Sequence, residues 1–143
     1  MEKQKCPEVR FKGFDRGWGA KNLSELGEIQ TGSTPSTTED SNYSKLGLLW
    51  VTPTDINSQL ILNSGKKLSI IGREKARIVP ANTILVTCIA SIGKNGLLQE
   101  EASFNQQINS LTPYVGNEPY FLLSQSYFWS ERMKQFAAKG TMQ

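Results

Sequence analysis

The longest periodic pattern of apolar positions lies at the C-terminal end of the chain. Asn117 can cap a helix, Pro119 is tolerated in a first helical turn, and Gly140 is a C-terminal helix signal. Between them, apolar side chains recur at helical spacing: Phe121, Leu122, Tyr127, Phe128, Trp129, Met133, Phe136 and Ala137. The pattern predicts a helix of about twenty residues whose broad apolar face packs against a sheet.

Short apolar runs separated by turn residues occupy the middle of the chain. They predict strands over 48–51, 60–62, 67–71, 83–89 and 108–111, and two short strands, 97–98 and 102–104, that pair with each other. A short helix is predicted over 22–28, because Asn22 and Glu25 form a capping box, and one helical turn over 72–76. These elements predict a single mixed α+β domain, with curved, mostly antiparallel short strands between a short N-terminal helix and the long C-terminal one.

Two segments outside these elements have a distinct composition. Residues 1–19 carry charges and glycines together with Phe11, Phe14 and Trp18, so we expect an extended arm laid on the domain with these aromatic side chains as anchors. Residues 31–42 contain turn formers and hydroxyl side chains without an apolar anchor. This segment is predicted to be a surface loop.

Composition bounds the class of protein. The chain has 143 residues, of which 38% are hydrophobic and 20% charged, which is typical of one globular domain. No histidine is present, which excludes Ser-His-Asp and Cys-His nucleophiles and histidine-liganded metals within the chain. Cys88 lies in an apolar run and is read as a small buried hydrophobe, and Cys6 as an exposed thiol. With no long apolar run and no secretory segment, we expect a soluble, cytoplasmic protein.

Charge is unevenly distributed along the chain, although the net charge is only +3. Residues 22–64 hold one basic and five acidic residues, whereas residues 65–94 hold six basic residues and one acidic residue. A basic segment of this kind can bind phosphate or can be a solvated face. Charge alone leaves both readings open.

Catalytic chemistry finds little support. The chain has no glycine-rich nucleotide loop and no nucleophile elbow. Asp55 and Glu74 could pair as carboxylates of a nuclease, but no acidic residue is followed two positions later by lysine, and we read both as surface or turn residues. We therefore expect no enzyme activity, no metal site and no cofactor.

Polar side chains suited to reading hydrogen-bond patterns are frequent instead. Asparagine and glutamine can pair with adenine, arginine and lysine with guanine, and serine or threonine with a base or a phosphate. Lys94 lies between two glycines, where backbone amides and an ammonium can meet a phosphate. Asn105 and Gln106 could instead cap backbone groups of a neighbouring loop.

Four segments together resemble a known family. TGSTPS at 31–36, LWVTPTDI at 49–56, ASIGK at 90–94 and FNQQI at 104–108 follow in the order and spacing seen in target recognition domains of type I restriction-modification specificity subunits. PEVRFKGF at 7–14 and LSELGEI at 23–29 look like the start of such a subunit.

The resemblance implies a DNA-binding module without catalysis of its own. A full subunit of that family carries two recognition domains, each reading one half of a split target, separated by long spacer helices. It sits between methyltransferase subunits, which use S-adenosylmethionine, and a restriction subunit joins them. In this chain, 1–143 would be one recognition domain, and the spacer helix and second domain are absent, as in a fragment or a shortened half-subunit.

The partners expected from the resemblance are double-stranded DNA, the methyltransferase and restriction subunits, and a second specificity half-subunit. The candidate DNA-binding residues are Thr34, Thr37, Thr38, Lys45, Thr54, Asp55, Lys66, Lys67, Arg73, Ser91, Lys94, Asn105 and Gln106. Segments shared by proteins that read different sequences cannot carry specificity, so we expect base reading in residues 37–45, 57–59 and 64–67. The alternative is a docking or regulatory half-subunit that binds protein partners and no DNA. An exposed apolar patch on the C-terminal helix would favour it.

Overall fold

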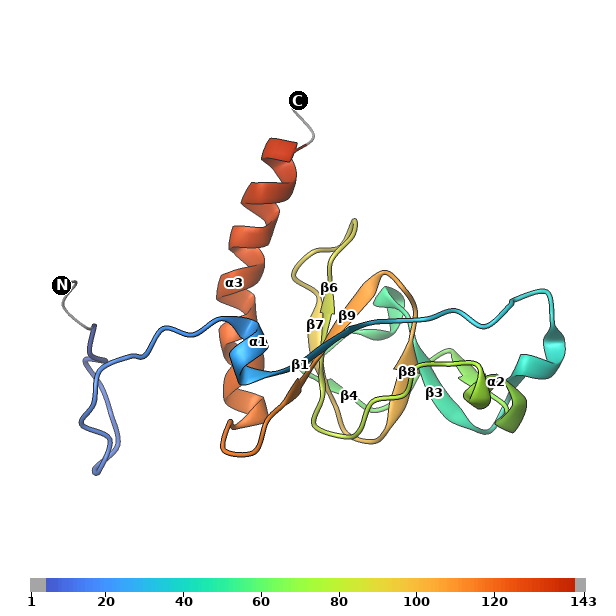
Figure 1. Ribbon diagram of the computed structural model, residues 1–143, viewed down its shortest axis with the longest axis horizontal. Coiled ribbons are helices and arrows are strands. Elements are labelled where there is room, and N and C mark those ends of the chain that lie inside the picture. The colour runs from blue at the N-terminus through green and yellow to red at the C-terminus, as the bar shows by residue number, and fades with distance from the viewer. Residues whose placement is uncertain (1–4, 141–143) are drawn as a thin grey trace.

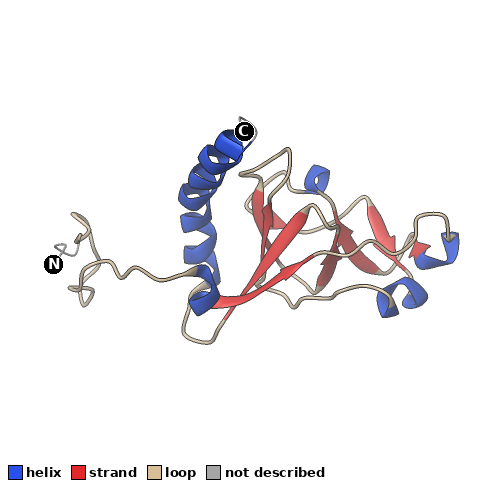
Figure 2. Ribbon diagram, turned by 45° about the horizontal axis from the view of Figure 1, so that its top comes forward, coloured by secondary structure: helices blue, strands red, loops and turns tan. Residues whose placement is uncertain are grey.

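Two small β-sheets and one long helix make up the body of the computed structural model, which describes residues 5–140 (Figure 1, Figure 2). The helices are α1 (Leu23–Leu26), α2 (Ile70–Glu74) and α3 (Pro119–Gly140), with single 3-10 turns η1 (Asp40–Asn42) and η2 (Pro53–Asp55). The strands are β1 (Gly27–Thr31), β2 (Tyr43–Ser44), β3 (Leu48–Val51), β4 (Leu60–Ile61), β5 (Lys66–Leu68), β6 (Ile84–Thr87), β7 (Asn95–Leu98), β8 (Ala102–Phe104) and β9 (Ile108–Pro113).

The strands divide between a five-stranded sheet, ordered β1-β9-β6-β7-β4, and a four-stranded sheet, ordered β2-β5-β3-β8. All neighbouring strands are antiparallel except β4 with β7 and β3 with β8. The prediction of a mixed α+β domain with short, mostly antiparallel strands is confirmed. The predicted pairing of 97–98 with 102–104 is wrong, because β7 and β8 belong to different sheets.

The core has two main layers, one on each face of the five-stranded sheet. On one face, Leu85 packs with Val51 and Phe104 of the four-stranded sheet. On the other face, Ile84 and Val86 pack against α3. Because β6 is buried on both faces, its apolar run is continuous rather than alternating.

Helix α3 contacts the sheet along a narrower stripe than its sequence predicts. Leu122 and Leu123 are buried against the sheet, whereas Phe128 is 72% and Phe136 is 73% exposed. The prediction that the whole apolar face is core is therefore wrong for these two side chains, which point away from the sheet. Asn117 also does not cap α3, because the helix begins at Pro119 and Glu118 directly precedes it; the Asn117 Nδ2 instead donates to the Leu26 carbonyl at 2.9 Å.

Two helix and strand boundaries also differ from the prediction. The first helix ends at Leu26, and Ile29 lies in β1, because this segment pairs with β9 over its whole length. The strand predicted over 67–71 ends at Leu68, and α2 follows at once, because Ser69 caps it by accepting a hydrogen bond from the Gly72 amide.

The N-terminal arm runs away from the domain instead of lying on it (Figure 1). Phe11 is 85% and Phe14 is 71% exposed, so neither is an anchor. Trp18 alone makes the predicted kind of contact, stacking on Phe121 with ring centroids 5.9 Å apart. Cys6 is exposed, as expected, and Cys88 is half-buried beside the α3 layer of the core.

Candidate nucleic-acid interface

The loops that follow β1, β3, β6 and β8 leave the two sheets at the same end of the strands. Three ladder pairs define this end: Thr31 with Asn109, Val51 with Phe104, and Thr87 with Ile108. Since β1, β3, β6 and β8 end here, their following loops are neighbours. We call these loops, residues 32–34, 52–55, 88–94 and 105–107, the strand-end edge.

Backbone hydrogen bonds join these loops to one another. The Ser33 amide donates to the Phe104 carbonyl at 2.9 Å, and the Asn105 amide donates to the Val51 carbonyl at 3.0 Å. The Cys88 amide donates to the Gln107 carbonyl at 3.2 Å. The edge is therefore a connected surface that presents several of the predicted DNA-binding residues together: Thr34, Thr54, Asp55, Ser91, Lys94, Asn105 and Gln106.

The loop over residues 88–94 is closed by hydrogen bonds of its own. The Thr87 hydroxyl donates to the carbonyls of Ser91 and Lys94, and the Lys94 amide donates to the Thr87 Oγ1 at 3.1 Å. Gly93 has a φ of +102°, which favours glycine. The Lys94 amide is thus engaged inside the loop, and what this loop offers outward is the Ser91 side chain and the half-buried Lys94 side chain.

Lys66 reaches the strand-end edge from β5, where it pairs with Trp50 at the end of β3. Its Nζ lies 5.8 Å from the centre of the Tyr43 ring, and Lys66 forms no ion pair within residues 5–140. The Tyr43 hydroxyl donates to the Pro35 carbonyl at 2.7 Å. The Trp50 indole contacts the Tyr43 ring edge-on and donates to the Ser33 carbonyl at 3.0 Å. Lys66 is thus a cation without a carboxylate partner, held over an aromatic platform.

The same two aromatic residues fix the hydroxyl-rich loop. The sequence predicts a surface loop without an apolar anchor over 31–42, and Thr34, Thr37 and Thr38 are indeed exposed. Pro35 and Asn42 are nevertheless buried: Tyr43 and Trp50 bind the Pro35 end of the loop from outside the segment, and the Asn42 carbonyl accepts from the Ser69 amide at 3.0 Å. Sequence reasoning missed Tyr43 and Trp50 as supports of this site; Tyr43 gave no signal beyond its aromatic character, whereas Trp50 lies in the resemblance segment 49–56.

Asp55 accepts hydrogen bonds instead of projecting freely from the edge. Its Oδ2 accepts from the Thr52 amide at 2.8 Å and from the Thr52 hydroxyl at 3.0 Å, and its Oδ1 accepts from the Gly65 amide at 2.8 Å. The first bond closes the η2 turn, and the last one joins that turn to the segment that precedes Lys66. Asp55 is half-buried.

The described part of the chain offers no metal site, since no cluster of three histidine, cysteine or acidic side chains occurs within residues 5–140. Over the same residues, no helix combines the length and the apolar character needed to cross a membrane.

Comparison with known proteins shows which family shares this arrangement. Residues 15–143 match the family described as "Type I restriction modification DNA specificity domain". The chain belongs to this family. The four segments on which the resemblance rests, 31–36, 49–56, 90–94 and 104–108, all lie at or beside the strand-end edge of this specificity domain.

Relatives with similar sequences are specificity subunits of type I restriction enzymes. The domain is 35% identical over 100 residues to the HindI specificity subunit of Haemophilus influenzae, covering 68% of this chain and 22% of that protein. It is 32% identical over 148 residues to the MjaIX specificity subunit of Methanocaldococcus jannaschii, covering 94% of this chain and 34% of that protein. The specificity domain therefore spans about a third or less of the length of these relatives.

Solved structures share the fold. The HsdS subunit from Thermoanaerobacter tengcongensis superimposes with a TM-score of 0.66 at 17% identity, over 89% of this chain and 30% of that one. A chain from a structure described as concerning complex assembly and conformational transition of the type I R-M system has a TM-score of 0.61 at 14% identity, over 78% of this chain and 27% of that one.

Several predicted residues of the specificity domain lie at the opposite end of the four-stranded sheet. Thr37 and Thr38 precede η1, Lys45 lies in the turn between β2 and β3, and Arg73 lies in α2. Lys67 is half-buried in the middle of β5. Since β3 spans about 10 Å at the usual rise per residue, this far end is separate from the strand-end edge.

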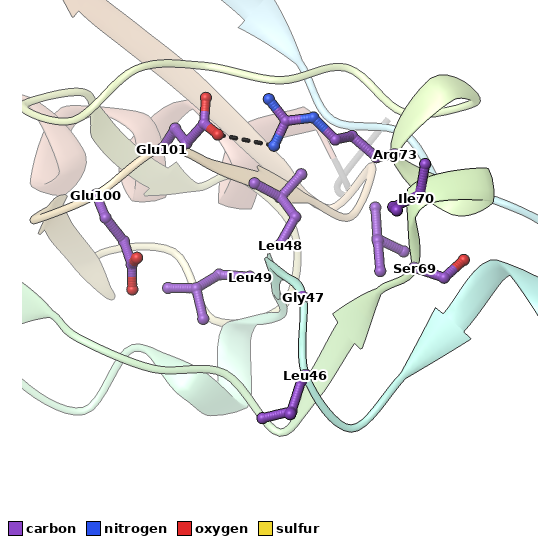
Figure 3. Close-up of a pocket in the computed structure, with 10 residues that line it drawn as sticks. Leu46, Gly47, Leu48, Leu49, Ser69, Ile70, Arg73, Glu100 and Glu101 are labelled. Atoms are coloured by element: carbon purple, nitrogen blue, oxygen red, sulfur yellow. Dashed lines mark hydrogen bonds and ion pairs between the residues drawn. The ribbon is translucent and has the colours of Figure 1, made fainter.

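Ion pairs neutralise part of the basic segment at this far end. Arg73 pairs with Glu101 at 2.7 Å on the rim of a cavity of 310 Å³ whose lining includes four leucines (Figure 3), and Lys75 pairs with Glu39 at 2.7 Å. The hydrogen bond and charge of Arg73 hold the pKa of Glu101 below its usual value. Two of the six basic residues in 65–94 are therefore paired with carboxylates from outside this segment, which leaves less unpaired positive charge than the sequence indicates.

Proposed function

We propose that this specificity domain binds double-stranded DNA through the strand-end edge and recognises one half of a split target for a type I restriction-modification enzyme. The observation that carries the proposal is the joining of the four resemblance segments into one hydrogen-bonded surface beside Lys66. Such a surface combines a cation with hydroxyl and amide groups that can hold the phosphates of a duplex, and bases would be read by segments outside the family motifs, among them 64–67, which carries Lys66. Family membership supports the same assignment.

The side chains at the edge suit different parts of the contact. Lys66 and Lys94 would anchor phosphates, because a lysine ammonium is a point charge that reaches them without strict geometry. Thr34 and Gln106 are exposed and can donate or accept toward DNA, whereas the exposed Thr54 hydroxyl donates to Thr52 Oγ1 and can only accept. Asn105 is half-buried, and its Oδ1 accepts from the Gln107 amide at 3.1 Å, so its outward group is the Nδ2 donor.

The assembly in which the domain would act includes methyltransferase and restriction subunits, which carry the chemistry, so the domain itself would be non-catalytic and would need no cofactor. We propose that residues 1–143 form one recognition domain, since β6 is packed against the four-stranded sheet on one face and against α3 on the other.

The test is binding of a labelled random-sequence duplex at 50 and 200 mM salt. Phosphate contacts predict a steep loss of affinity over this interval, and Lys66→Ala should lower the slope of log K against log salt by about one. Lys45→Ala is the matched control, because Lys45 is an exposed lysine at the far end. An equal loss of slope in both variants would show that the strand-end edge is not the contact surface.

One observation favours a second candidate, a docking half-subunit that binds protein partners and no DNA. Phe128 and Phe136 are largely exposed on α3, and so are Phe11 and Phe14 on the arm. Exposed aromatic side chains of this number are typical of protein contact surfaces. A folded chain that binds no duplex even at 50 mM salt would select this candidate over DNA recognition.

A further inference from the structure

We infer that Asp55 is a positioning residue for DNA binding: it fixes the place of Lys66 by clasping two loops, and does not touch DNA itself. The inference rests on the proposed function of the strand-end edge and changes the role expected for Asp55 from its sequence. The link in question is the hydrogen bond by which Asp55, in the η2 turn, holds the segment 63–66.

The carboxylate of Asp55 is already used within the protein. Oδ2 has two donors on Thr52, its amide and its hydroxyl, and Oδ1 has one donor, the Gly65 amide. A carboxylate beside DNA is repelled by phosphate and can pair only with donors such as the cytosine amino group. With three donors satisfied inside the protein, Asp55 gains little by turning outward.

The clasp acts directly on the backbone that carries Lys66. Gly65, whose amide Asp55 holds, precedes Lys66 in the chain. On the other side, the Ser64 hydroxyl accepts from the Trp50 amide at 3.2 Å and donates to the Lys66 carbonyl at 2.5 Å, and Ser64 is 7% exposed. The peptide groups around Lys66 are thus tied to η2 by Asp55 and to β3 by Ser64.

The consequence is a fixed spacing between a hydroxyl and a cation. Thr54 lies in the same η2 turn, and its Oγ1 is 2.8 Å from the Thr52 Oγ1 that also bonds Asp55. Loss of the clasp would free η2 from the Lys66 segment, so both groups would have to be ordered when DNA binds. The free energy needed to order these groups lowers the affinity for DNA.

The first experiment compares Asp55→Asn with Asp40→Asn, an exposed carboxylate at the far end, in duplex binding at several salt concentrations. Asparagine keeps the shape of the side chain but replaces one carboxylate oxygen by an NH₂ donor. It therefore loses the hydrogen bonds either to Thr52 or to the Gly65 amide. We expect Asp55→Asn to weaken binding about three- to tenfold, the equivalent of one hydrogen bond, with the salt slope unchanged. Asp40→Asn should bind as the unchanged chain does.

Combination with Lys66→Ala separates positioning from direct contact. If Asp55 acts through Lys66, Asp55→Asn should cost little further affinity in the Lys66→Ala background. Additive losses in the double variant would show that Asp55 contacts DNA independently, and would overturn the inference. Equal affinities of Asp55→Asn and Asp40→Asn would overturn it as well.

Two further measurements keep the result clear if Asp55→Asn folds poorly or the unchanged chain does not bind DNA. Thr52→Val removes the hydroxyl that bonds Asp55 and Thr54 but leaves the Thr52 amide bond to Asp55, so it should reproduce a smaller part of the loss, which Thr52→Ser should restore. Hydrogen exchange of the segment 63–67, measured without DNA, should accelerate in Asp55→Asn and not in Asp40→Asn; unchanged exchange would overturn the clasp. Absence of binding by the unchanged chain would instead overturn the proposed function, and with it the role of the clasp in binding.

Discussion

Substitution of Asn95 tests how α3 is fastened to the five-stranded sheet. Asn95 is 3% exposed at the start of β7, and its Nδ2 donates to the hydroxyls of Ser126 and Ser130 on α3, both at 2.9 Å. The Ser126 hydroxyl in turn donates to the Leu123 carbonyl at 2.6 Å. Asn95→Ala would leave two buried serine oxygens without this donor.

The magnitude follows from these contacts. Two lost hydrogen bonds at about 0.5–1.5 kcal/mol each give about 1–3 kcal/mol. The Asn95 Oδ1 is buried without a partner in the described structure, which destabilises the folded state. Its removal by Asn95→Ala therefore offsets part of the loss from the two hydrogen bonds. We therefore expect Asn95→Ala to lower the free energy of unfolding by about 1–2 kcal/mol, which corresponds to a Tm lower by about 3–7 °C in a domain of this size.

The assay is urea unfolding followed by tryptophan fluorescence, with Asn63→Ala as the control because Asn63 is exposed. Surface substitutions of this kind change the free energy of unfolding by less than about 0.5 kcal/mol. In a chain that already carries Ser126→Ala and Ser130→Ala, Asn95→Ala should cost much less, because its acceptors are gone. The same loss in Asn95→Ala and Asn63→Ala would refute the polar link between β7 and α3.

Two further outcomes concern the close packing at Gly72 and the half-buried Cys88 thiol. Gly72→Ala should destabilise the domain by about 1–3 kcal/mol in thermal unfolding, since a Cβ there would lie 2.0 Å from the Asn42 carbonyl oxygen. Gly19→Ala is the control, because a Cβ there meets nothing within 4 Å. A gain in stability in Gly72→Ala would contradict this packing. Burial raises the pKa of the Cys88 thiol, so a smaller fraction is thiolate at pH 8, and a thiol reagent should label the exposed Cys6 first. Single-cysteine variants that react at equal rates would contradict the second outcome.

Local patterns predicted the elements well where neighbours in sequence determine them. The periodic stretch at the C-terminal end became α3, and the apolar run around Leu85 became β6. Which strands share a sheet could not be predicted, because it depends on distant partners: β3 pairs with β8, about fifty residues later in the chain. The same limit explains Phe128, since helical periodicity cannot show how wide a stripe the sheet will cover.

The candidate site was predictable in part for a similar reason. The resemblance segments lie together in the folded domain, but the sequence did not show the contacts that hold them. Arg73 was expected to be available for phosphate, yet it pairs with Glu101, a residue 28 positions away. Asp55 showed its three donors only in the folded chain, because Gly65 lies ten positions beyond it.

The pairing of β1 with β9 has a consequence for synthesis on the ribosome. Within the described structure, β1 (Gly27–Thr31) has β9 (Ile108–Pro113) as its one neighbouring strand in the sheet. A nascent chain must therefore hold its first strand unpaired until nearly the whole domain has left the exit tunnel. During that interval the segment presents open backbone donors and acceptors, the condition in which chaperones bind and strands of separate chains associate. Completion of the five-stranded sheet is consequently a late event, and a chain that stops short of Ile108 has no partner for β1.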